Sequence, residues 1–243
     1  VEMQFADFVS EGITQITNNM AKMHWRWGQN VDAVVRMPTG AGVGAGPFHS
    51  QSNEAWFTHI PGLKVVYPAF PADAKGLLLR SFEDPNPVLF FEHKALYRSL
   101  RQEVPEGYYT LPIGKAATVK EGTDVTIVSY GMGVHWALEA LDKHPEISAD
   151  LIDLRTLLPL DEQAIIDSVN KTGKVIILHE DTLFNGIGGE LSAIISEKCF
   201  EKLDAPVMRV GGMDTAVPFA ADLEKHFLAN HRFEDKLVEL FKY

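Results

Sequence analysis

Cysteine is almost absent from this sequence, since Cys199 is the only one among 243 residues. A single cysteine excludes an internal disulfide and a thiolate metal cluster. The neighbours of Cys199 include the apolar residues Ile195 and Phe200. We therefore expect it to be a buried core thiol and not a reactive one.

Long hydrophobic runs and positive charge are also scarce. No apolar stretch approaches the roughly 18 residues that a membrane helix requires, and the start, Val1–Gln4, lacks the charged and apolar regions of a signal peptide. The chain has 22 Lys and Arg against 33 Asp and Glu, a net charge of −11, and no basic tract. Because phosphate binding needs clustered Lys and Arg, we expect neither a nucleic-acid nor a membrane partner.

Two nucleotide-binding signatures are missing from the glycine-rich segment Thr39–Gly46. The dinucleotide fingerprint needs glycines at its first, third and sixth positions, and the sixth position counted from Gly40 is Ala45. The segment is also not followed by the Lys-Ser or Lys-Thr pair of a phosphate-binding P-loop. Two interpretations remain open, namely a flexible backbone that approaches a cofactor or a partner subunit, or a plain structural loop.

What the sequence does contain is an alternation of apolar strands and helices that stops once and then resumes. With 46% hydrophobic and 23% charged residues, the composition is typical of a globular protein. The alternation predicts parallel sheets with helical crossovers, the α/β class. Between the two runs the chain is charged and contains proline and glycine, as linkers do. We therefore predict two doubly wound domains, 1–100 and 122–243, with a linker at 101–121.

The expected elements follow from apolar periodicity and from glycine and proline boundaries. In the first domain we expect strands at 1–6, 33–37, 65–67 and 87–91, and helices at 10–24, 52–59 and 72–82. In the second domain we expect strands at 124–129, 149–153, 175–178 and 207–210, and helices at 134–142, 161–169, 188–200 and 233–241.

His49 is the most informative single residue. A glycine-rich approach and Pro47 place it on a loop between two predicted strands, where α/β proteins commonly position reactive groups. Histidine donates or accepts a proton near neutral pH. The placement therefore suggests a catalytic histidine.

Several segments resemble a known family when taken in their order along the chain: Gly46–Pro68, Pro71–Leu78, Phe90–Arg98, Leu151–Asp161 and Asp204–Val210. The chain resembles, over essentially its whole length, the β subunit of the thiamine-diphosphate-dependent 2-oxo acid dehydrogenases. These subunits belong to the E1 components of large multienzyme complexes. The resemblance implies an incomplete transketolase-like pyrimidine-binding domain followed by a transketolase C-terminal-like domain.

The same resemblance implies an activity and a set of partners. The activity is oxidative decarboxylation of a 2-oxo acid with thiamine diphosphate and Mg²⁺, followed by acyl transfer to the lipoyl domain of E2. The segments Leu96–Arg98, Glu103–Pro105 and Ser168–Gly173 resemble the branched-chain members more than the pyruvate members. The implied partners are an E1 α subunit or fused α half, a second αβ pair, and the lipoyl domain and core of E2. The implied location is the cytoplasm in a bacterium or the mitochondrial matrix in a eukaryote.

The resemblance also implies roles for individual residues. His49 would lie beside the thiazolium ring of the cofactor, where it would stabilise charge on the substrate-derived oxygen or act as an acid during acyl transfer. Phe8 falls where the family has an aromatic residue near the aminopyrimidine, and an ordinary core phenylalanine is the alternative. Asp84 and Asn86 fall near a structural potassium ion of branched-chain members, which also uses carbonyls equivalent to 31–34. A simple turn is the alternative there. We interpret 179–181 as interface residues or as residues that lead into the next helix.

Two parts of the family's site have no counterpart in this sequence. The Gly-Asp-Gly signature for magnesium and diphosphate is absent, and in this family it belongs to the α subunit. The glutamate that bonds the aminopyrimidine belongs to a segment ahead of Val1, which we expect to be missing here. The chain should therefore supply half of a site completed at a subunit interface. The alternatives are a pyruvate or acetoin dehydrogenase β subunit, and a non-catalytic assembly module.

Overall fold

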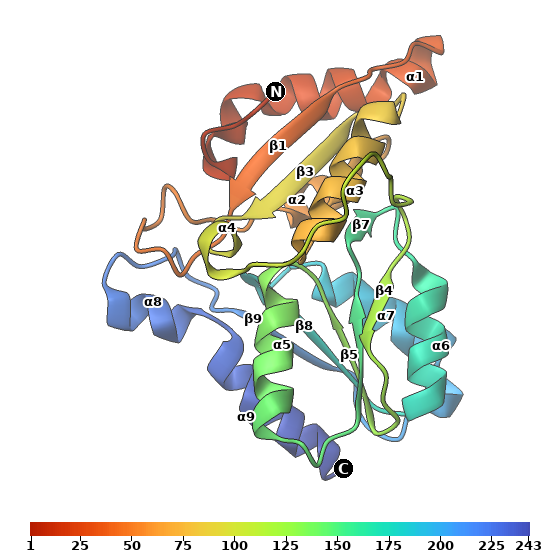
Figure 1. The fold of residues 1–243 in the computed structure, drawn as a ribbon, viewed down its shortest axis with the longest axis vertical. Helices are drawn as coiled ribbons and strands as arrows, with labels where there is room; N and C mark the ends of the chain where they lie inside the picture. The colour runs from red at the N-terminus through yellow and green to blue at the C-terminus, as the bar shows by residue number, and fades with distance from the viewer.

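The computed structural model describes all residues from Val1 to Tyr243 and arranges them around two sheets that lie one beyond the other along the molecule (Figure 1). One sheet has four strands and the other has five. Each sheet has helices on both sides, which is the α/β architecture expected from the alternation of apolar segments. None of the helices is both long and apolar enough to cross a membrane.

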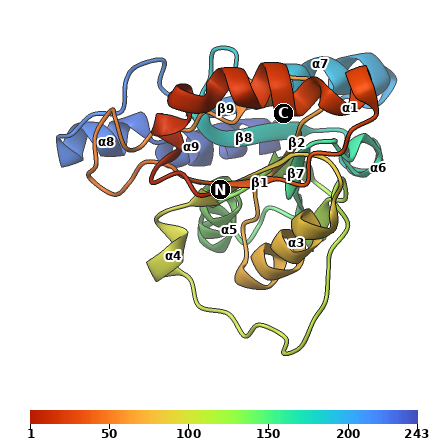
Figure 2. The same cartoon turned by 90° about the horizontal axis from the view of Figure 1, so that it is seen from above.

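The first sheet has the strand order β1-β3-β2-β7. Its parallel strands are β1 (Val34–Thr39), β3 (Val88–His93) and β2 (Lys64–Val66), and β7 (Thr156–Leu158) runs antiparallel to β2. Every residue of β3 is buried, because helices cover both faces of a central parallel strand. The helix α3 (Pro71–Glu83) lies on one side and the N-terminal helical segment on the other (Figure 2). The short helices α2 (Ala55–Thr58) and α4 (Leu96–Ser99) complete this part of the chain.

The N-terminal segment differs from the prediction. The expected strand at 1–6 was wrong: only Glu2 forms an isolated bridge, to Arg36, and the chain is already helical at Ala6. The helix expected at 10–24 is present and longer. It runs through the 3₁₀ helix η1 (Ala6–Gly12), the π-helix η2 (Gln15–Met20) and α1 (Ala21–Trp27), and ends at Gly28 with a left-handed φ of 67°.

The second sheet has the strand order β4-β6-β5-β8-β9. Its parallel strands are β6 (Ala149–Asp153), β5 (Val125–Ser129), β8 (Val175–Thr182) and β9 (Met208–Gly212), and β4 (Ala117–Lys120) is an antiparallel edge. The helices are α5 (Met132–Lys143), α6 (Glu162–Thr172), α7 (Gly188–Lys198), η3 (Phe200–Lys202), α8 (Ala221–Phe227) and α9 (Asn230–Phe241). In Figure 1, α5 and α9 lie together, as do α6 and α7.

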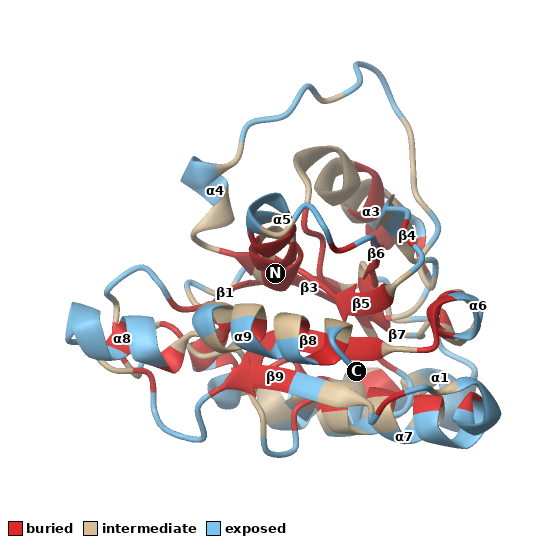
Figure 3. Cartoon of the chain, turned by 90° about the horizontal axis from the view of Figure 1, so that it is seen from below, coloured by how far each residue is buried: buried red, intermediate tan, exposed pale blue.

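The strands β4 and β7 and the short helices α4, η3 and α8 were not predicted from the sequence. The strand β4 occupies the end of the segment expected as linker, whereas 100–116 runs without regular structure along the outside of the molecule and is largely exposed (Figure 3). The strand β7 comes from the second half of the chain but completes the first sheet. One hydrophobic cluster of 25 buried residues likewise includes Met37 and Phe57 from the first half and Ile152 and Val175 from the second. The two halves therefore share a core.

Candidate functional site

His49 and two phenylalanines form an aromatic cluster at the carboxyl end of the first sheet. The chain leaves β1 at Thr39, passes through the glycine-rich segment, and turns at Pro47–His49. The imidazole meets Phe5 edge-on, with ring centroids 5.0 Å apart and an interplanar angle of 88°, and it meets Phe8 at 5.5 Å and 89°. Edge-to-face contacts of this kind are favourable. The structure thus brings together His49 and Phe8, two residues that the sequence singled out separately.

Phe8 is not a core residue. Its side chain is 39% exposed, while Phe5 beside it is half-buried. An aromatic ring that is partly open to solvent can pack against a flat heterocycle. The cluster therefore offers a partly open aromatic surface beside an imidazole.

Hydrogen bonds fix the N-terminal segment to the loop that carries His49. The buried carboxylate of Asp7 accepts hydrogen bonds from the backbone N–H of Gln51 at 3.1 Å and from its side-chain amide at 3.0 Å. The amide of Asn53 donates to the carbonyl of Ala6 at 3.1 Å. Because these bonds lie just beyond His49, they hold the phenylalanines and the imidazole in one arrangement.

Lys94 adds a cation to this end of the sheet. Its ammonium nitrogen is buried, has no hydrogen-bond partner, and lies 5.3 Å from the centroid of the Phe5 ring. Burial lowers the pKa of Lys94, and the charges of Asp7, Glu180 and Glu224 partly oppose that shift. A buried ammonium without a partner is suited to an anionic group. No sequence pattern indicated this residue.

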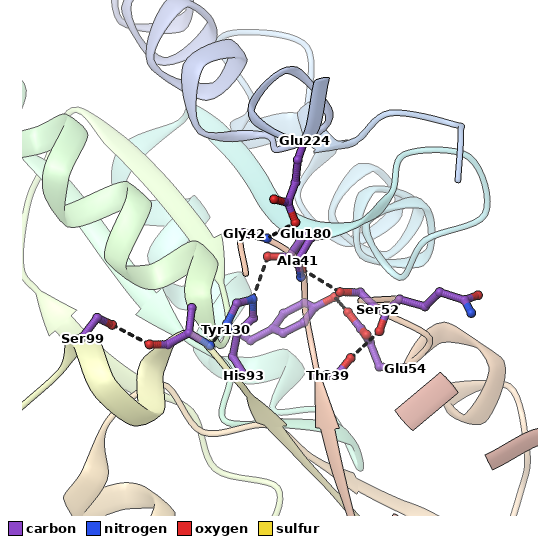
Figure 4. Close-up of polar contacts among 12 residues, drawn as sticks. Thr39, Ala41, Gly42, Ser52, Glu54, His93, Ser99, Tyr130, Glu180 and Glu224 are labelled. Atoms are coloured by element: carbon purple, nitrogen blue, oxygen red, sulfur yellow. Dashed lines mark hydrogen bonds and ion pairs between the residues drawn. The ribbon is translucent and has the colours of Figure 1, made fainter. Parts of the chain in front are cut away.

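Glu180 on β8 is the centre of a buried network (Figure 4). Its Oε1 accepts hydrogen bonds from the backbone N–H of Ala41 at 2.6 Å and from the hydroxyl of Ser52 at 3.0 Å. Its Oε2 lies 2.7 Å from Nε2 of His93. Nδ1 of His93 accepts a hydrogen bond from the N–H of Ala95. The ring proton is therefore assigned to Nε2, which donates a hydrogen bond to Glu180. Burial raises the pKa of Glu180, but His93 and the other donors outweigh it, so the pKa is below its usual value.

A second carboxylate binds the glycine-rich segment. Glu224 on α8 accepts hydrogen bonds from the N–H groups of Gly42 at 2.9 Å and Gly44 at 3.2 Å. Both glycines have left-handed φ angles, 79° and 70°, which let successive N–H groups point to one acceptor. Within this chain the glycine-rich segment therefore binds carboxylates of the second domain.

Two further buried acids lie beside this network. Burial, together with the charge of Asp181, raises the pKa of Glu54 to about 8. Burial and the charge of Glu180 raise the pKa of Asp181 to about 7. The hydroxyl of Tyr130 donates to Glu54 at 2.7 Å. At neutral pH this pair therefore retains a proton that exposed carboxyl groups would lose.

The remaining candidates of the sequence lie elsewhere. Asp84 forms an ion pair with Lys64 at 2.5 Å through Oδ2, and its Oδ1 accepts hydrogen bonds from the backbone and side chain of Asn86 at 3.0 and 3.1 Å. Both carboxylate oxygens of Asp84 thus have partners within the chain. The segment 179–181, interpreted from the sequence as an interface or helix-leading segment, is buried inside the molecule, where Glu180 contacts the first domain.

A groove elsewhere on the chain does not include His49. It has a volume of about 1390 Å³, and its lining includes Leu157–Leu160 and Leu183–Ile187. A smaller cavity of about 180 Å³ lies between Gln51–Asn53 and Glu180–Thr182. His49 therefore lies outside both cavities, in the partly open aromatic cluster.

Comparison with protein families defines the class of this fold. Residues 1–99 match the transketolase pyrimidine-binding domain, and residues 114–232 match the transketolase C-terminal domain. A solved structure described as "Split gene transketolase, inactive beta4 tetramer" superimposes with a TM-score of 0.77 and 26% sequence identity, and covers 98% of this chain and 74% of that one. The fold is therefore of the transketolase type, as the sequence predicted.

Two bacterial relatives give the family within that class. The 2-oxoisovalerate dehydrogenase subunit beta of Bacillus subtilis is 49% identical over 94% of this chain and 72% of its own length. The pyruvate dehydrogenase E1 component subunit beta of the same organism is 43% identical over 96% of this chain and 72% of its own. Of two longer mitochondrial relatives named as 2-oxoisovalerate dehydrogenase β subunits, this chain spans only 63% and 62%. The chain belongs to the family of 2-oxo acid dehydrogenase E1 β subunits, and it is more similar to the 2-oxoisovalerate member than to the pyruvate member of the same organism.

Proposed function

We propose that this chain is the β part of a branched-chain 2-oxo acid dehydrogenase E1, which decarboxylates the substrate oxidatively and delivers the acyl group to a lipoyl domain of E2. The observation that supports it most is the edge-on packing of His49 against Phe5 and Phe8. This places a proton-transferring group beside a partly open aromatic surface. The higher identity to a 2-oxoisovalerate β subunit than to a pyruvate β subunit, 49% against 43%, favours the branched-chain substrate.

The cofactor we propose is thiamine diphosphate with Mg²⁺, bound jointly with an α subunit or a fused α half. Thiamine diphosphate supplies the carbon nucleophile and the electron sink that decarboxylation of a 2-oxo acid requires. Phe8 would hold the aminopyrimidine, and His49 would lie at the thiazolium end. Because no Gly-Asp-Gly sequence is present, the magnesium and diphosphate ligands would come from the α part.

Within that joint site the residues of this chain have distinct tasks. His49 would donate a hydrogen bond to the oxygen derived from the substrate carbonyl and so stabilise negative charge there. Alternatively, it would act as an acid during acyl transfer and protonate the sulfur that leaves when the lipoyl disulfide opens. Phe5 and Phe8 would shield one side of the cofactor from water in the joint site, which would strengthen these interactions.

A potassium ion near Asp84 and Asn86 remains a proposal. The backbone N–H of Val31 donates to the carbonyl of Pro85 at 3.0 Å, so the segment 31–34 and the 84–86 turn lie together. Oxygen ligands suit such a hard cation. Since both oxygens of Asp84 already have partners, backbone carbonyls would supply most of the ligands.

Two other functions compete with this proposal. A pyruvate or acetoin dehydrogenase β subunit would use the same residues with a smaller substrate pocket. A non-catalytic assembly module would have no need for a half-buried imidazole against two phenylalanines. We also propose that the chain pairs with a second αβ unit and contacts the lipoyl domain and core of E2, in line with the family to which it belongs.

The substrate is tested by steady-state decarboxylation with an artificial electron acceptor. The full-length protein is combined with its α partner, thiamine diphosphate and Mg²⁺, and 3-methyl-2-oxobutanoate is compared with pyruvate. We expect kcat/KM for the branched substrate to exceed that for pyruvate by about tenfold or more, as its two extra buried carbon atoms allow. A preference for pyruvate would assign the chain to the pyruvate members, and no turnover of either would favour the assembly module.

A further inference from the structure

The loop that carries His49 is fixed at both ends by a single carboxylate from the other domain. Glu180 accepts the backbone N–H of Ala41, ahead of the histidine, and the hydroxyl of Ser52, behind it. Both bonds end on the same oxygen, Oε1. The two ends of the loop therefore cannot move apart without breaking a bond to Glu180.

The orientation of Glu180 is itself determined by its second oxygen. Oε2 accepts a hydrogen bond from Nε2 of His93 at 2.7 Å. Both side chains are almost completely buried, since Glu180 is 5% and His93 is 1% exposed. His93 ends β3 and is packed against Gly40, where an added Cβ would lie 2.2 Å from Nε2. A hydrogen bond to an ionised acceptor is shorter and stronger than a neutral one. The carboxylate is thus held in place by a rigid strand end.

Other charged groups around the loop do not replace Glu180. Glu224 binds the tip of the glycine-rich segment, at Gly42 and Gly44, and leaves the ends free. Asp7 binds Gln51 from the N-terminal segment. Only Glu180, among these three carboxylates, bonds residues on both sides of His49.

We propose that Glu180 is a positioning residue for His49, which acts from the second domain by fixing both ends of the loop that carries the imidazole. This inference rests on the proposed catalytic role of His49. Glu180 does not touch the aromatic cluster through any hydrogen bond of its own, so its effect on the reaction is transmitted by the loop backbone. The interface between the two domains is then a part of the catalytic apparatus.

The expected effect of Glu180→Ala is a loss of turnover with little loss of substrate binding. Displacement of a catalytic group by about 1 Å costs on the order of 100-fold in rate. We expect kcat to fall by about that factor and KM for the 2-oxo acid to change by less than about threefold, since His49 acts mainly in the transition state. Glu180→Gln keeps one oxygen acceptor for Ala41 and Ser52 but places an amide NH2 against the donor Nε2 of His93, so it should recover only part of the loss. Glu239→Gln is the matched control, because Glu239 is exposed on α9 and pairs only with Lys236.

Hydrogen exchange tests the loop independently of any reaction. In the assembled full-length protein, Glu180→Ala should accelerate amide exchange in 40–52 by about tenfold or more, with no acceleration in Glu239→Gln. If wild type shows no turnover, the proposed function fails, but this exchange comparison still decides whether Glu180 holds the loop. Unchanged exchange in 40–52 would overturn the inference. Should Glu180→Ala fail to fold, Ser52→Ala removes one of the two hydrogen bonds between the loop and Glu180. Its amide exchange in 40–52 is then compared with wild type in the same way.

A double-mutant cycle separates positioning from general damage. If Glu180 acts through His49, adding Glu180→Ala to His49→Ala should lower kcat by less than about a further threefold. The effects of substitutions at residues that act as a unit are strongly non-additive. If the two defects multiply, Glu180 has a separate structural role and the inference is wrong.

Discussion

Buried carboxyl groups have different protonation states at the scale of single residues, although they are close in the network. Glu180 receives three hydrogen bonds and has a lowered pKa. Glu54 receives one, from Tyr130, its Oε2 has no partner, and its pKa is raised to about 8. Burial and the charge of Asp181 raise the pKa of Glu54, whereas the charge of His93 and the three donors outweigh the effect of burial on Glu180.

Glu54 should make the protein less stable as pH rises. Unfolded, this carboxyl group loses its proton near pH 4.5, whereas in the folded protein it holds the proton up to about pH 8. Between these pH values the folded state binds more protons than the unfolded state. The contribution of Glu54 to folding stability is therefore fully present below pH 4.5 and is lost as pH rises through 8. Glu54→Gln, which still accepts from Tyr130, should be more stable than wild type at pH 8 by on the order of 2 kcal/mol, with no such gain at pH 4.

Denaturant unfolding of both proteins at several pH values measures this difference. Glu11→Gln on the exposed surface is the control and should follow wild type throughout. If the stability of Glu54→Gln relative to wild type does not grow with pH, Glu54 is not protonated in the folded state.

Sequence-based prediction at the scale of residues depended on a local motif. The segment Gly46–Ser50 pointed to His49, and the structure places Phe8 against it, while the catalytic role of His49 stays a prediction. Lys94 was not singled out, and Glu180 was interpreted only as part of an interface or helix-leading segment, because the surroundings of both residues are assembled by distant segments. The bond from Ala41 to Glu180 joins residues 139 positions apart, and no local pattern encodes such a contact.

At the scale of elements, one glycine decides how the N-terminal helical segment packs. Gly62 lies in the turn between α2 and β2 with a left-handed φ of 97°. A Cβ added there would lie 1.9 Å from the carbonyl oxygen of Ala21 on α1. The backbone carbonyl cannot move aside as the end of a flexible side chain can. The turn and the helix therefore pack this closely only with glycine at position 62.

Gly62→Ala should destabilise the protein by roughly 2–4 kcal/mol, through the unfavourable φ and the displacement of α1. The melting temperature and the urea midpoint report the change. Gly12→Ala is the matched control, because nothing lies within 4 Å of an added Cβ and φ is not left-handed there. Equal stability of the two variants would show that α1 is not pressed against this turn.

Long periodic elements were predicted from the sequence, and short ones that depend on tertiary partners were not. The buried strand β3 and the helix α3 follow from continuous apolar residues and helical spacing. The strand β7 has three residues and pairs with β2 across the domain boundary. The strand β7 forms only by pairing with β2 at the edge of the folded first sheet. The local sequence therefore could not predict this strand.

At the scale of the whole molecule, the two domains act as one body around the His49 loop. They share the largest hydrophobic cluster, β7 of the second half completes the first sheet, and the loop is bound by Glu180 and Glu224. The sequence predicted two α/β domains of the transketolase type. It could not predict that the second domain holds the His49 loop of the first, because that depends on how the domains dock.

The central claim is that His49 performs chemistry in a site completed by an α subunit. The most direct measurement compares turnover of 3-methyl-2-oxobutanoate by wild type and His49→Ala, each assembled with the α partner, thiamine diphosphate and Mg²⁺. Assembly and cofactor binding are measured on the same samples. The account predicts that His49→Ala assembles and binds the cofactor like wild type, while kcat falls by about 10²- to 10³-fold, the usual contribution of a proton-transferring group. Wild-type turnover by the assembled variant would contradict it.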